Sequence, residues 1–113
     1  MKRLILLILL SLAMTTTSVN AEVHEMKATA YCIQGQTASG TNTRYGICAG
    51  KPEWIGKKAS VFLKYNAHYL GTYIVEDTGG ESIKNGEVLD LWFQSEDLCK
   101  KFGCVDVRVV IEE

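Results

Sequence analysis

Apolar residues recur at every second position along much of this chain, and that period is typical of β-strands rather than helices. The C-terminal segment shows it most clearly, because Val105, Val107, Val109 and Ile111 alternate there with residues expected to face outward. We expect residues 22–26, ahead of the first strand, to be a frayed end. The pattern predicts six strands, at residues 27–33, 47–49, 59–65, 70–76, 88–93 and 105–112.

A single short helix is predicted between the last two strands. Ser95 is a favourable N-cap, Glu96 and Asp97 follow in the first turn, and Gly103 stands just past the end. Roughly two turns of helix are too little to cover a sheet. A mostly β fold with so little helix buries its apolar faces most readily as a small closed barrel.

The longest connection, residues 34–46, is polar, is punctuated by glycines and has no apolar period. Long loops within a small domain are typically functional or disordered. Asn85-Gly86, in a later connection, is a favourable turn sequence. Each of these two connections could therefore form part of a functional site or could simply link two strands.

The N-terminal segment has the features of a secretory signal peptide over residues 1–21. Lys2 and Arg3 precede an apolar run, and small residues stand before the expected cleavage point after Ala21. The run is shorter than the ~20 residues that span a bilayer. We therefore expect a secreted protein without a stable membrane anchor, whose residues 22–113 form one domain.

The charge of the chain argues against one class of partner. Its formal net charge is −1, and removal of Lys2 and Arg3 makes the remaining domain more acidic. The sequence contains no basic stripe of the kind that tracks a phosphate backbone. A nucleic-acid partner is therefore disfavoured.

Four cysteines, Cys32, Cys48, Cys99 and Cys104, lie in the expected domain. An even number of cysteines in a small secreted chain predicts disulfides, and four of them allow three pairings. We favour Cys32–Cys48 with Cys99–Cys104, since each bond closes a local loop. A zinc site is the alternative, but the sequence has no Cys-x-x-Cys pair, and we expect neither a metal nor another cofactor.

Two aspartates stand in informative surroundings. Asp77 begins the stretch Asp-Thr-Gly-Gly, in which it could simply cap its own backbone in a turn. Asp90 lies between Leu89 and Leu91 in an apolar strand, where it could face solvent or a cleft. In a cleft, desolvation would raise the pKa of Asp90. A carboxylic acid that keeps its proton near neutral pH suits the cleavage of a glycosidic bond.

Five short segments occur in an order that resembles the 3D domain, a small double-psi β-barrel named for its aspartates. They are ATAYC at 28–32, TASGTNTRYG at 37–46, EDTGG at 76–80, IK at 83–84 and LDLWF at 89–93. The domain occurs in bacterial cell-wall proteins, including lytic transglycosylases of the MltA type. The resemblance implies a small six-stranded double-psi β-barrel with one short helix.

The resemblance also implies a chemistry. In that family one aspartate protonates the glycosidic oxygen between N-acetylmuramic acid and N-acetylglucosamine. Its carboxylate then accepts the proton of the C6 hydroxyl while a 1,6-anhydro ring closes. Asp90 matches this aspartate, and Asp77 matches the supporting aspartate beside it. The implied partner is a peptidoglycan glycan strand, the implied location is the cell wall, and we expect a monomer.

Further residues are candidates for binding the glycan. The loop from Thr37 to Thr41 matches one flank of the family's cleft. Trp92 shares a strand face with Asp90 and could stack on a sugar or pack in the core. Lys84 could bind a wall-peptide carboxylate or remain a solvated lysine. The predicted binding residues are Thr37, Ser39, Gly40, Thr41, Gly79, Gly80, Lys84 and Trp92.

The sequence departs from the family pattern at two places. The family usually carries another aspartate before a proline, where this chain has Lys51-Pro52 followed by Glu53. The interval from Asp77 to Asp90 is also longer than usual. A non-catalytic wall-binding or polysaccharide-binding module, and a glycosidase that uses water, are therefore the alternatives to a lytic transglycosylase.

Overall fold

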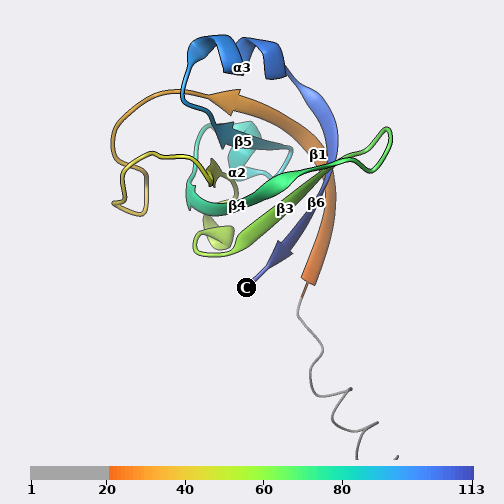
Figure 1. The fold of residues 1–113 in the computed structure, drawn as a ribbon. Coiled ribbons are helices and arrows are strands. Elements are labelled where there is room, and N and C mark those ends of the chain that lie inside the picture. Colours follow the sequence, from red (N-terminus) through yellow and green to blue (C-terminus); the bar gives the residue numbers. More distant parts are fainter. Residues whose placement is uncertain (1–20) are drawn as a thin grey trace, which may run out of the picture.

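The computed structural model describes residues 21–113, so the expected signal peptide lies almost wholly outside the described residues. Figure 1 shows how the strands and short helices are arranged. The strands are β1 (Ala21–Tyr31), β2 (Ile47–Ala49), β3 (Lys58–Leu63), β4 (Tyr69–Asp77), β5 (Val88–Trp92) and β6 (Val105–Glu112). The helical segments are the 3-10 turn η1 (Pro52–Trp54), the single turn α2 (Glu81–Lys84) and the helix α3 (Glu96–Phe102).

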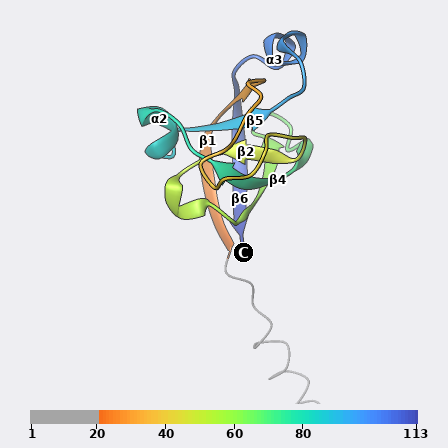
Figure 2. The same ribbon diagram turned by 90° about the vertical axis from the view of Figure 1, so that its left-hand side faces the viewer.

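The six strands close into a barrel in the order β1-β5-β2-β4-β3-β6. The pairs β1–β5 and β2–β4 are parallel, whereas the other neighbouring strands run antiparallel. Figure 2 shows the same barrel from the side, with α3 beyond one end. Closure gives every strand two partners, so the barrel leaves no sheet edge unpaired. The predicted small, six-stranded, mostly β barrel is confirmed.

The predicted strands agree with the observed ones within a few residues, except at the start of β1. Residues 22–26, expected to be a frayed end, instead pair with β6 over a register that runs from Ala21↔Glu112 to Ala28↔Val105. Met26 is buried in this segment, with 7% of its surface exposed. The long, apolar β6 needs a partner along its whole length, and the start of β1 provides it.

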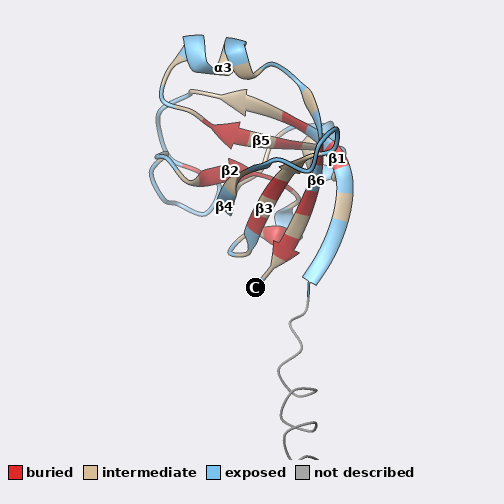
Figure 3. Cartoon of the chain, turned by 45° about the vertical axis from the view of Figure 1, so that its right-hand side comes forward, coloured by how far each residue is buried: buried red, intermediate tan, exposed pale blue. Residues whose placement is uncertain are grey.

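The core lies inside the barrel, and the alternation of β6 points into it as predicted. Val107, Val109 and Ile111 are at most 1% exposed, while the alternating Asp106 and Arg108 face solvent. Figure 3 shows the buried positions running along β2, β3, β5 and β6. The core cluster comprises Met26, Ala28, Cys48, Trp54, Ala59, Val61, Val75, Leu89, Leu91, Val107, Val109 and Ile111.

The helix α3 begins and ends as its sequence predicts. The Ser95 hydroxyl accepts a hydrogen bond from the Leu98 amide at 3.2 Å, and Gly103 ends the helix with φ 65°. The Asn85-Gly86 turn closes α2, a single helical turn that the sequence analysis took for loop. Among residues 21–113, no helix is long and apolar enough to cross a membrane.

The cysteines differ from the sequence-based expectation, because all four are free in the structure. Neither the Cys32–Cys48 nor the Cys99–Cys104 disulfide is present. Cys48 points into the barrel core from β2 and is 0% exposed. Cys32 lies past the end of β1, and Gly103 turns the chain away from α3 just before the exposed Cys104. The structure therefore contains neither of the two predicted local bonds.

The alternation of β6 predicts a sharp contrast between two adjacent valines. Val109→Ala should lower the free energy of unfolding by about 2–3 kcal/mol, because it removes two methyl groups from a fully buried position. Val110→Ala, on the outward and only partly buried face, should cost less than about 1 kcal/mol. Urea denaturation measures both variants, and equal losses would contradict the observed strand orientation.

Candidate functional site

The two aspartates are brought together by the short central strand β2. Ala49 is the pairing partner of Asp77 on β4 and, on its other side, of Asp90 on β5. Neighbouring strands lie ≈ 4.8 Å apart, so the two aspartate Cα atoms are separated by about 10 Å. A register shift between Cys48 and Ala49 places Ala49 opposite Asp77 rather than opposite Glu76. The strand order thus places both acids over the same small area of the barrel.

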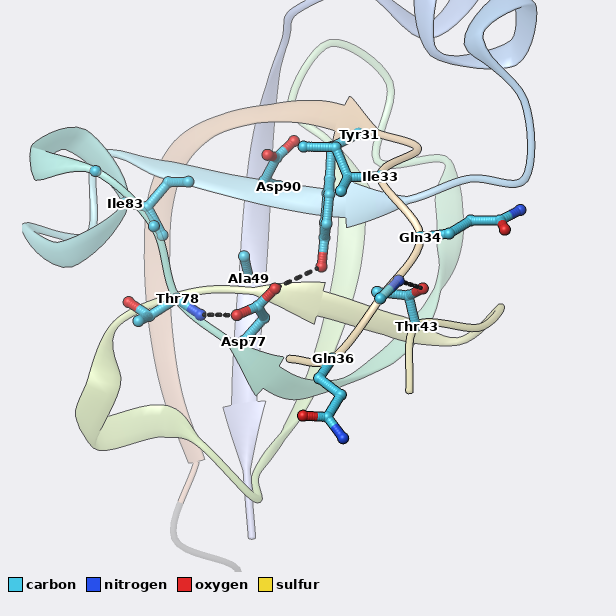
Figure 4. Close-up of a pocket in the computed structure, with 13 residues that line it drawn as sticks. Tyr31, Ile33, Gln34, Gln36, Thr43, Ala49, Asp77, Thr78, Ile83 and Asp90 are labelled. Carbon is cyan, nitrogen blue, oxygen red and sulfur yellow. Dashed lines mark hydrogen bonds between the residues drawn. The ribbon is translucent and has the colours of Figure 1, made fainter. Parts of the chain in front are cut away.

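Both aspartates line a pocket of about 520 Å³ on the barrel surface. Figure 4 shows Asp90 and Asp77 projecting toward it from two different strands, with the Tyr31 side chain between them. The wall opposite is formed by the first part of the 34–46 loop and by the turn that leads into α2. The lining residues are Tyr31, Ile33, Gln34, Gly35, Gln36, Thr43, Ala49, Asp77, Thr78, Gly79, Gly80, Ile83 and Asp90.

Asp90 is a partly buried acid with one fixed hydrogen-bond donor. Leu89 and Leu91 turn into the core at 0% exposure, so Asp90 faces the opposite side of β5, toward the pocket. The hydroxyl of Thr29, its pairing partner on β1, donates to its Oδ1 at 2.8 Å. Desolvation raises the pKa of Asp90, the Thr29 hydrogen bond opposes this, and the negative charge of Asp77 raises it further. Asp90 is therefore suited to hold a proton and release it.

Asp77 is occupied in a different way, because it accepts hydrogen bonds on both of its oxygens. Its Oδ1 accepts from the backbone amides of Ala38 at 3.0 Å and Thr78 at 2.9 Å. Its Oδ2 accepts from the Tyr31 hydroxyl at 3.2 Å. Three fixed donors hold this carboxylate at the end of β4 and tie the 34–46 loop to it.

Tyr31 donates to Asp77 and lies near Asp90, a role that the sequence analysis did not assign to it. Burial raises the pKa of the Tyr31 phenol, and the charges of Asp77 and Asp90 raise it further, so the hydroxyl remains a donor. Thr29 and Tyr31 are two residues apart on β1 and therefore face the same side. Their spacing is visible in the sequence, but the parallel pairing of β1 with β5 is not.

The predicted binding loop from Thr37 to Thr41 braces the fold instead of lining this pocket. The hydroxyl of Thr37 is 2.9 Å from that of Ser39 and 2.8 Å from that of Thr41. The Thr41 hydroxyl also donates to Glu76, and the Ser39 amide donates to the Glu76 carbonyl at 3.1 Å. Neither these three side chains nor Gly40 are among the lining residues.

Glu76 accepts the hydrogen bonds that hold this loop against the barrel. It is only 7% exposed, yet the Arg44 guanidinium reaches both of its oxygens, at 2.8 and 2.5 Å. This bidentate contact lowers the pKa of Glu76, and the hydrogen bond from Thr41 lowers it further. Desolvation acts in the opposite direction but is outweighed. Arg44 and Glu76 thus hold the folded loop against the end of β4.

The remaining predicted residues divide between the pocket and its surroundings. Gly79 and Gly80 line the pocket. Trp92 is 5% exposed, donates its indole N–H to the Ile33 carbonyl at 2.9 Å, and packs against the edge of Tyr45 at 5.5 Å. Lys84 is exposed on α2 and lies outside the pocket lining. Trp92 therefore holds Ile33, which lines the pocket, through the hydrogen bond to its carbonyl.

Lys51, at the place of the family's additional aspartate, also lies outside the lining. Its ammonium group stands 5.4 Å from the ring centroid of the buried Trp54, a cation–π contact. Glu53, the nearest acid that could replace the missing aspartate, is exposed and is likewise absent from the lining. The pocket therefore contains two acids, Asp77 and Asp90.

The loop contributes lining residues that the sequence analysis had not singled out. Gln34, Gly35, Gln36 and Thr43 come together because the Gly35 amide donates to the Thr43 hydroxyl at 3.2 Å and Gln36 forms a bridge with Asn42. No amphipathic period marks these residues, so only the closed loop shows that they share a wall with the aspartates.

No group of three or more His, Cys, Asp or Glu side chains in residues 21–113 is arranged to hold a metal ion. Comparison of the chain with protein-family models, curated proteins and solved structures gave no match. The features of the chain that bear on a function are therefore the pocket itself and the motifs that resemble the 3D domain.

Replacing Asp90 should make the fold more stable at neutral pH. Because its folded-state pKa is raised, stability is highest below the ordinary titration range of Asp and falls as the pH rises through the folded-state pKa. Asp90→Asn removes that loss and can still accept from Thr29. Its melting temperature should exceed that of the wild type by a few degrees at pH 7, and the difference should vanish near pH 3.

Thermal unfolding followed by circular dichroism at both pH values tests this. Asp97→Asn, the same change at an exposed position on α3, is the matched control and should show no comparable gain. A loss of stability in Asp90→Asn at pH 7 would show that Asp90 stabilises the fold rather than destabilising it.

Proposed function

We propose that this protein cleaves the glycan strands of peptidoglycan as a lytic transglycosylase, with Asp90 as its acid and base. One observation carries the proposal: Asp90 is a partly buried acid with a raised pKa on the floor of a surface pocket, beside a second acid that is fully engaged by donors. The exported, wall-associated location and the monomeric state belong to the same proposal.

The reaction requires Asp90 to act twice. Its carboxyl group first donates a proton to the glycosidic oxygen as the bond to the N-acetylmuramic acid C1 breaks. The resulting carboxylate then removes the proton of the C6 hydroxyl, whose oxygen bonds to C1 and closes the 1,6-anhydro ring. Asp90 ends the cycle protonated, so neither water nor a second base is consumed.

The state of Asp77 favours this one-acid route over hydrolysis. An inverting glycosidase needs a second carboxylate that is free to activate a water molecule. Asp77 instead accepts from Tyr31, Ala38 and Thr78 through both oxygens. Its role in the proposal is to orient Tyr31 and the loop, and to raise the pKa of Asp90 through its charge.

The lining of the pocket suits an amide-bearing sugar. Gln34, Gln36 and Thr43 offer hydrogen-bond donors and acceptors, whereas Ile33 and Ile83 offer small apolar surfaces. The pocket volume of about 520 Å³ lies within the ≈ 300–1,000 Å³ typical of small-molecule sites. An N-acetylated sugar residue presents the same mixture of hydroxyl, amide and methyl groups.

A non-catalytic wall-binding module is the second candidate, and one residue favours it. Lys51 replaces the family's additional aspartate and is directed toward Trp54 rather than the pocket. If the missing acid is essential, the pocket would bind glycan without cleaving it.

Product analysis separates the candidates. Incubation of purified protein with sacculi should release muropeptides ending in 1,6-anhydro-N-acetylmuramic acid, as detected by mass spectrometry. Asp90→Asn should reduce the release by at least a hundredfold, because it cannot donate the proton, whereas Asp97→Asn should retain wild-type release. Reducing ends in place of anhydro ends would indicate hydrolysis. Co-sedimentation of wild type and Asp90→Asn with sacculi, without any release, would indicate the binding module.

The pH dependence of the rate tests Asp90 through its neighbour Thr29. The reaction needs protonated Asp90, so kcat/KM should fall as the pH rises through the pKa of Asp90. Thr29→Val removes the hydrogen bond that lowers this pKa, so the alkaline limb of the profile should move to higher pH.

Thr43→Val is the matched control, because Thr43 lines the same pocket but donates no hydrogen bond to Asp90. It can change the rate, but the alkaline limb should stay in place. An unmoved limb in Thr29→Val would mean that a group other than Asp90 supplies the proton.

A further inference from the structure

The helix α3 lies alongside the C-terminal end of β1, where the two elements are in contact (Figures 1 and 2). One aromatic contact fixes its orientation: the rings of Phe93 and Phe102 meet edge to face, with centroids 5.2 Å apart. The Phe93 amide also donates to the Tyr31 carbonyl at 2.8 Å. The end of β1 and the start of the α3 segment are thus held together.

Two thiols occupy this junction, one on each side. Cys32 directly follows Tyr31 and so lies beside Phe93. Cys99 is three residues before Phe102, which places both on one face of α3, the face that packs on Phe93. Both thiols are partly buried. The geometry of the junction therefore turns Cys99 toward the end of β1 that carries Cys32.

The pKa of the Cys99 thiol agrees with this placement. Burial raises this pKa, and the nearby Cys32 raises it further.

The other two cysteines are poorly placed as partners for Cys32. Cys48 is 0% exposed inside the barrel, and burial raises the pKa of its thiol far above its ordinary value. Cys104 immediately precedes Val105, which pairs with Ala28. In this antiparallel register Cys104 lies at the level of Thr29, three residues before Cys32, so about 10 Å of strand separates Cys104 from Cys32.

We propose that Cys32 and Cys99 form a disulfide when the chain meets an oxidising thiol–disulfide couple. One thiolate attacks the disulfide of the oxidant and forms a mixed disulfide, which releases one reduced thiol. The second thiolate attacks the protein sulfur of that intermediate and displaces the second reduced thiol. The two cysteines together lose two protons and two electrons, and the oxidant's sulfurs are reduced.

This bond would join elements that are far apart in the sequence. It closes a loop of nearly seventy residues, which restricts the unfolded chain much more than the five-residue step from Cys99 to Cys104 would. Tyr31 and Ile33, on either side of Cys32, both line the pocket. The disulfide would therefore also fix that wall of the pocket, and its formation does not depend on the proposed function.

Oxidised glutathione is a suitable probe. After treatment of the purified protein, intact-mass analysis should show the loss of two hydrogens, and proteolysis without reductant should yield one peptide pair linked through Cys32 and Cys99. The melting temperature should rise on the order of 10 °C, and dithiothreitol should reverse the rise.

Single substitutions identify the pair. Cys32→Ser and Cys99→Ser should each lose the cross-link and the thermal gain, while matching the reduced wild type under reducing conditions. Cys104→Ser is the control and should keep both the cross-link and the gain in melting temperature. A dominant Cys99–Cys104 link, or glutathione adducts without an internal bond, would overturn the proposal.

Discussion

The pairing of β2 with strands on both sides is the constraint on which the rest of the structure depends. Its three residues are all buried, and they join β4 in parallel on one side to β5 in antiparallel on the other. Without this link the barrel could not close, because β2 stands between β4 and β5 in the order of the sheet. The same link places Asp77 and Asp90 at one level, on either side of Ala49.

Closure of the barrel also explains how a small domain can carry a destabilising acid. The core side chains of β5 and β6 are almost completely buried, so the hydrophobic contribution is concentrated in one compact cluster. Asp90 is partly desolvated because it stands on the strand that presents those side chains. Its neighbours Leu89 and Leu91 hold this strand in the core. By contrast, the buried Glu76 is paired with Arg44, whose side chain is half exposed, and that pair supports the loop over the pocket.

The sequence predicted the strands and the helix much better than it predicted which strands pair in the barrel. Period-two alternation identified β6, and capping residues identified α3, because both signals are local. The parallel pairing of β1 with β5 is not local, so the roles of Thr29 and Tyr31 beside the aspartates could not be read from the chain. The hydroxyl-rich loop was assigned to ligand binding for a related reason. Its side chains could bond a sugar or each other, and the structure shows them bonded to each other and to Glu76.

Tyr31 shows why two nearby acids can have separate tasks in one pocket. A shared proton between two carboxylates would make their titrations inseparable. Here the phenol donates to Asp77, and its raised pKa keeps that donor in place while Asp90 gains or loses its proton. The charge of Asp77 raises the pKa of Asp90, while both Asp77 oxygens accept hydrogen bonds from Tyr31, Ala38 and Thr78. In the proposed reaction Asp90 donates a proton and then recovers one from the same substrate, and β1 supplies its fixed neighbours, Thr29 and Tyr31, two positions apart.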